Sequence, residues 1–154
     1  MAEIAKFKVI RWILYLAMMF NSYMLNQNIS NNLKFIIGEK VWCPAFGSNA
    51  RCDVALLHSI IGIISGASLF LMGILDDDTK KLKFFNKNES ILCLIQVPIW
   101  IGFFINIFQW TKEMETSAFE INCIYISILA NISFLICSGI VSYIEKGVRI
   151  SREN

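Results

Sequence analysis

Two cysteines stand close together in a stretch that also holds several turn-forming residues. Cys43 and Cys52 lie in the sequence WCPAFGSNARC, where Pro44, Gly47 and Asn49 favour turns that can bring the two thiols together. In an oxidising compartment two such thiols pair as a disulfide. The stretch contains no His and no further Cys, so the residue types do not favour zinc binding. The spacing therefore predicts a Cys43–Cys52 disulfide, with two reduced thiols as the alternative in a reducing compartment.

The other reactive residues do not form a catalytic pattern. The sequence has no nucleophile–base pair, Gly-rich phosphate loop or H-E-x-x-H motif. Asp76, Asp77 and Asp78 could form a metal cluster, but three acids after an apolar run more simply end a helix in solvent. We therefore expect no enzymatic activity, no cofactor and no metal site.

Two residues are candidates for covalent modification. Asn28 begins the sequon NIS and is a candidate for N-glycosylation. Cys93 lies near the start of an apolar segment, where it is either reversibly palmitoylated or an inert thiol. The two further cysteines, Cys123 and Cys137, have no assigned partner, and Cys137 is expected to be a small buried residue.

Four apolar segments must position these residues. Residues 54–75 contain no Asp, Glu, Lys or Arg, and about 20 apolar residues suffice to cross the hydrocarbon core of a bilayer. The chain of 154 residues is 56% hydrophobic and 17% charged, whereas soluble domains have about 25% charged residues. Similar segments cover residues 9–25, 91–110 and 122–144. We predict an all-α membrane protein that forms one domain over residues 1–154, a four-helix transmembrane bundle.

The basic residues predict the orientation. Most of them flank the same ends of the four segments: before the first, between the second and third, and after the fourth. Under the positive-inside rule both termini are then cytosolic, and the polar loops 26–53 and 111–121 face outward. No A-x-A-like cleavage site follows the first segment, so we expect it to stay as a signal-anchor. The net charge of +2, without a long basic run, gives no indication of nucleic-acid binding.

Small residues line one face of the second segment. Ser59, Gly62, Gly66 and Gly73 recur at helical spacing and include a G-x-x-x-G motif. Such residues let membrane helices approach closely. The face either packs within the four-helix bundle or receives a partner protein or a second copy of the chain.

A few polar side chains fall within or near the apolar segments. They are His58, Gln96, Asn106, Gln109 and Asn131. Because lipid exposure of such groups is expensive, they should face the bundle or the membrane interfaces. Hydrogen bonds between helices explain them, and a small carrier, channel or proton path is the alternative.

The chain resembles the synaptogyrin and synaptophysin group of four-span vesicle proteins, within the MARVEL-domain class. The third segment ends GFFINIFQW, which is similar to the synaptogyrin ending G-F-x-x-x-x-x-Q-W at Gly102, Phe103, Gln109 and Trp110. Trp100 falls in the aromatic-rich run that precedes this ending in the family. The cysteine pair directly before the second segment and the short Lys-rich connection also look similar, and the likeness extends over residues 8–148.

The resemblance implies a non-enzymatic organiser of vesicle or trafficking membranes. Its partners would be membrane lipids and other integral membrane proteins, and it would be a multi-pass protein of vesicles, endomembranes or the plasma membrane. The alternative is a small auxiliary subunit of a channel, receptor or proton-pump complex. A claudin-like junction protein is a more distant resemblance, carried by Trp42 and the cysteines, but the claudin G-L-W signature is absent.

Overall fold

The structure is a computed structural model, and it describes residues 2–32, 35–37, 40–42, 50–74 and 80–153. These residues form four long α-helices, α1 (Ala2–Asn32), α2 (Ala50–Ile74), α3 (Lys80–Trp110) and α4 (Ala118–Glu153). A short antiparallel hairpin of β1 (Phe35–Ile37) and β2 (Lys40–Trp42) precedes α2, with Ile36 opposite Val41. A 3₁₀ turn, η1 (Thr111–Glu113), follows α3. The predicted all-α fold with four long helices is confirmed in the described part of the chain.

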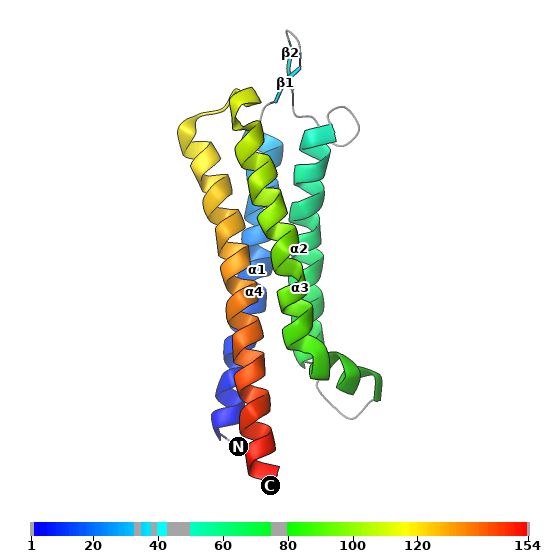
Figure 1. Ribbon diagram of the computed structural model, residues 1–154. Coiled ribbons are helices and arrows are strands. Elements are labelled where there is room, and N and C mark those ends of the chain that lie inside the picture. The colour runs from blue at the N-terminus through cyan, green and yellow to red at the C-terminus, as the bar shows by residue number, and fades with distance from the viewer. Residues whose placement is uncertain (1, 33–34, 38–39, 43–49, 75–79, 154) are drawn as a thin grey trace.

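The four helices stand side by side as an up-and-down bundle (Figure 1). The hairpin and η1 lie at one end, here called the hairpin end, and both termini lie at the other, the terminal end. Helix α1 packs extensively against α2 and α4, and α3 packs against α4, whereas α2 and α3 touch much less. The cytosolic placement of the termini stays a prediction.

Three of the described helices are long and apolar enough to cross a membrane. The qualifying segments are Arg51–Met72, Asn88–Glu113 and Ala118–Val148. Helix α1 is not among them, because Arg11 and a series of amides near its end interrupt its apolar sequence. A crossing by residues 9–25 therefore stays a prediction.

The bundle core follows an alternating spacing of four and three residues on α1. The buried positions there are Arg11, Tyr15, Met18, Ser22, Leu25 and Ile29. This spacing keeps one stripe of a helix against neighbours that cross at a shallow angle. The core therefore runs along the whole bundle and includes polar residues as well as apolar ones.

The helices extend beyond the predicted apolar segments. Helix α1 continues through residues 26–32, which were expected to begin the outward loop, and α3 begins at Lys80 inside the expected charged connection. Helix α4 continues to Glu153, well beyond the end of the predicted segment at Ile144. A helix does not have to end where the hydrocarbon core ends, because its backbone hydrogen bonds are satisfied internally in water as well.

Candidate functional site

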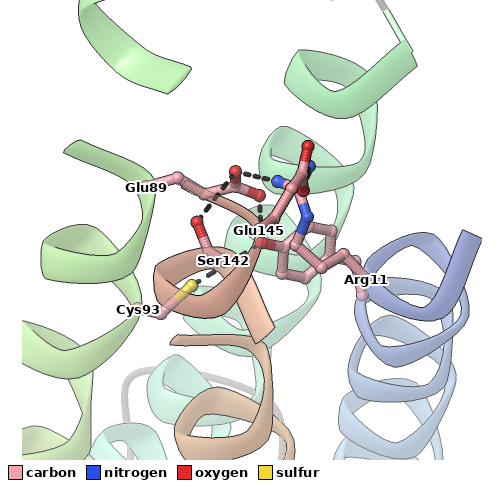
Figure 2. A network of polar contacts seen from close by, with 6 residues as sticks. Arg11, Glu89, Cys93, Ser142 and Glu145 are labelled. Carbon is pink, nitrogen blue, oxygen red and sulfur yellow. Dashed lines mark hydrogen bonds and ion pairs between the residues drawn. The ribbon is translucent and has the colours of Figure 1, made fainter. Parts of the chain in front are cut away.

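A buried group of charged residues joins three helices near the terminal end of the bundle. Arg11 of α1 is only 6% exposed, and its guanidinium lies between two carboxylates from helices later in the chain (Figure 2). Its Nη1 donates to Oε2 of Glu89 on α3, and its Nη2 pairs with Oε2 of Glu145 on α4 at 2.6 Å. We call Arg11, Glu89 and Glu145 the charged triad.

Neutral side chains complete the surroundings of Glu89. The Tyr15 hydroxyl donates to Oε1 of Glu89, and the Ser142 hydroxyl donates to Oε2 at 3.5 Å. The same Tyr15 oxygen lies 3.7 Å from the thiol sulfur of Cys93. Glu89 thus accepts hydrogen bonds from three side chains in place of the water that burial removes, which is the condition for a buried charge to be tolerated.

Helical spacing explains why these residues meet. Residues three or four positions apart lie on one face of a helix. Arg11 and Tyr15 are four apart on α1, and Glu89 and Cys93 are four apart on α3. Ser142 and Glu145 are three apart on α4. Each helix therefore brings a pair of polar side chains to the same level of the core.

The chemistry available to the charged triad is neutralisation of charge between helices. Glu89 and Glu145 lie within segments that can cross a membrane, and Arg11 reaches both. No group of three or more metal-ligating residues occurs among the residues that the structure describes. The arrangement fixes α1, α3 and α4 to one another, because separating any of them leaves a charge without its partner in an apolar setting.

A second polar layer lies nearer the middle of the bundle. The amide of Asn21 donates to the Ser127 carbonyl at 2.7 Å and to Oδ1 of Asn131 at 2.9 Å. The amide of Asn131, which is fully buried, donates to the Ser22 hydroxyl at 2.8 Å. This layer joins α1 to α4, so Asn131 faces the bundle as expected.

The small-residue face of α2 is occupied within the chain. The Asn26 amide donates to the Ser59 hydroxyl at 2.8 Å. A Cβ added to Gly62 would overlap Ser22, and one added to Gly66 would lie 2.9 Å from the backbone nitrogen of Met19. Of the two alternatives predicted for this face, these contacts favour packing within the bundle, because Ser59, Gly62 and Gly66 contact α1. Gly73 lies in the last turn of α2.

The residues that carry the family resemblance divide between the core and the surface. Trp100 and Phe103 are buried, and the ring of His58 stacks on Phe103 at 4.3 Å between centroids. Gly102 has open space on its Cβ side, and Gln109 is exposed. They do not gather at one site.

The end of α3 is tied to the start of α2. The guanidinium carbon of Arg51 lies 5.8 Å from the ring centroid of Trp110. Arg51 also pairs with Glu113 of η1, with side chains 40% and 49% exposed. This partly exposed contact therefore connects the start of α2 to the end of α3 and to η1 at the hairpin end.

The described cysteines differ in their state, and the predicted disulfide involves one of them. Free thiols among the described residues are Cys93, Cys123 and Cys137, and Cys52 is not one of them and is completely buried. Cys137 is exposed on the bundle surface, so the expectation that it is buried is wrong. The predicted partner of Cys52, Cys43, lies outside the described residues, so the disulfide pairing stays a prediction. Asp76, Asp77 and Asp78 also lie outside the described residues.

The structure describes the surroundings of both modification candidates. Cys93 is completely buried against Tyr15, which favours an inert thiol over palmitoylation. Asn28 is half-buried within α1 and not in a loop. Sequons are used on accessible loops, so this position is unfavourable, and glycosylation of Asn28 stays an untested prediction.

The charged triad is the feature that sequence reasoning missed. Arg11 was counted only among the basic residues that predict the orientation, and Glu89 and Glu145 lay just outside the predicted segments 91–110 and 122–144, although an ionisable residue in a span indicates a specific partner. The available signal was one basic and two acidic residues near the same ends of three segments.

Comparison of the chain with models of protein families, with curated proteins and with solved structures found no match.

Proposed function

We propose that this protein is a non-enzymatic, four-span membrane organiser of the synaptogyrin-like MARVEL type, which acts in vesicle or trafficking membranes through lateral contacts. The observation that supports this proposal is the distribution of side chains. Large hydrophobic residues are exposed along all four helices, while the buried set includes Arg11, Ser59, Glu89 and Asn131. A surface of this kind belongs in lipid or against other membrane proteins, since monomeric soluble proteins rarely expose such apolar area.

Lateral contacts would use the lipid-facing surface and not the small-residue face. Phe20 on α1, Ile64 on α2, Ile95 on α3 and Ile126 on α4 are each 60% exposed or more. Van der Waals packing of such side chains against another helix is the interaction that remains available in a bilayer, where a hydrophobic drive between helices is absent.

Photo-crosslinking from the exposed positions tests this proposal. A photoreactive amino acid replaces Ile64, Ile95 or Ile126 in the full chain, and the matched control replaces Ile107, which is completely buried on α3. We expect crosslinks to other membrane proteins from at least one exposed position and none from position 107, in a membrane fraction that resists alkaline carbonate.

The crosslinked species separate the alternatives. Several vesicle proteins captured from one position support the organiser, and one partner captured in fixed stoichiometry supports an auxiliary subunit instead. Crosslinks to lipid alone from all three positions contradict a function through protein contacts. Solute flux into liposomes that contain only this chain would indicate a carrier or channel and would contradict the proposed organiser.

A further inference from the structure

Helix α1 differs from the other helices in how its polar residues are accommodated. It is the described helix that lacks an apolar segment sufficient to cross a membrane by itself. Yet four of its polar side chains point into the bundle: Arg11 and Ser22 are buried, and Asn21 and Asn26 are partly so, whereas Ser30 and Asn31 near the end of the helix are exposed.

The partners of these side chains all come from later parts of the chain. Asn26 binds Ser59 of α2, and Asn21 and Ser22 bind Asn131 of α4. Arg11 binds Glu89, which follows it by 78 residues, and Glu145. Glu89, Asn131 and Glu145 come so much later in the chain that they have not emerged when α1 leaves the ribosome.

The position of Arg11 makes this dependence strongest. An arginine near the end of a membrane helix ordinarily extends its side chain to the interface and keeps its charge in water. Arg11 instead turns inward, where Figure 2 shows it between Glu89 and Glu145. Its charge is neutralised only when α3 and α4 are in place.

We infer that α1 is a conditional span: it takes its place across the membrane only after α2, α3 and α4 have inserted, and the charged triad holds it there. This inference rests on the proposed membrane function. It also replaces the expectation that the first segment is a signal-anchor, because insertion then begins with the strongly apolar α2.

The side of the membrane on which each terminus lies reports the state of α1. Four crossings place both termini on one side, and three crossings place them on opposite sides. The full chain therefore carries a different epitope tag at each end, and protease digestion of sealed vesicles shows which tags are protected.

Three variants and the native sequence are compared. E89L/E145L removes both partners of Arg11, and R11L/E89L/E145L removes the charge as well. E115L is the matched control, since Glu115 is exposed in the connection before α4. We expect both tags on the same side in the native protein and in E115L, on opposite sides in most E89L/E145L molecules, and on the same side again in the triple variant.

Each other outcome overturns the inference in a distinguishable way. Same-side tags in E89L/E145L, or no recovery in the triple variant, show that the charged triad does not hold α1. Opposite-side tags in the native protein show that α1 does not cross, which removes the four-span part of the proposed function but leaves a membrane protein with three crossings. Release of the native protein by alkaline carbonate contradicts the proposed function itself.

Discussion

Arg11 determines whether its two acidic neighbours stabilise or destabilise the bundle. Its two carboxylate partners convert what would be a costly buried charge into a connection among three helices. Such groups are weak evidence for net stability, because replacing the whole set by apolar residues is often neutral or favourable. Removal of one member is different, since the remaining charge stays buried without compensation.

Replacement of Glu89 should therefore destabilise the bundle far more than replacement of the whole triad. We expect E89L to lower the free energy of unfolding by about 3–5 kcal/mol. The free energy of unfolding of R11L/E89L/E145L should be close to that of the native protein, and that of E115L should differ from the native value by at most about 0.5 kcal/mol. Unfolding in mild detergent with increasing denaturing detergent measures the differences. Equal destabilisation by E89L and by the triple variant would show that packing, and not charge, is what Glu89 provides.

Residue types alone identified part of this polar core. Asn131 could be expected to face inward, because an amide in an apolar segment needs a partner, and the structure gives it Asn21 and Ser22. The charged triad was not predicted, because the segments were limited to the apolar residues, which excluded Glu89 and Glu145. Hydropathy measures affinity for lipid, and it is blind to a charge that another helix neutralises.

At the scale of elements, the four helices could be predicted and their ends could not. Apolar length determines where a helix can cross lipid, but the helix continues as long as its residues tolerate helical geometry in water. The last turns of α4 illustrate this, since Glu145 is anchored to Arg11 and the residues after Gly147 contain no proline. The small-residue face was predictable as a packing surface, but its neighbour, α1, required the structure.

The approach of α2 to α1 depends on Gly66. A Cβ there would lie 2.9 Å from the backbone nitrogen and 3.1 Å from the Cα of Met19, and 3.0 Å from the Tyr15 carbonyl oxygen. Backbone atoms cannot move aside as a flexible side chain can, so G66A should separate the helices and destabilise by about 1–3 kcal/mol.

Gly102 provides the matched control for Gly66. It lies in α3 with nothing within 4 Å of an added Cβ, so G102A should be neutral or stabilising by up to about 1 kcal/mol through helix propensity. Unfolding of both variants in detergent, with α1–α2 crosslinking as a second readout, checks the pair. Equal effects of the two substitutions would mean that propensity, and not the close approach, dominates at Gly66.

At the scale of the whole molecule, the two ends of the bundle are held differently. The terminal end is closed by the buried charged triad. The hairpin end has the Arg51–Glu113 pair, which is about half exposed and is therefore worth at most about 1 kcal/mol. Few other contacts join α2 to α3 along their length.

The predicted disulfide would add a covalent connection next to Arg51, between the loop before α2 and the start of α2. Cys52 is completely buried in the first turn of α2, so a bond to Cys43 would fix the loop against the packed helix start. Closing a loop of this size stabilises by roughly 2–3 kcal/mol on the chain-entropy model. We expect C43S to lose about that much in the free energy of unfolding under oxidising conditions. Reducing agent should weaken the native protein by the same amount and leave C43S unchanged. C123S, which replaces a free thiol near the same end, is the control and should respond to reducing agent as the native protein does. A native protein that is insensitive to reducing agent would mean that the hairpin end is held by the helices alone.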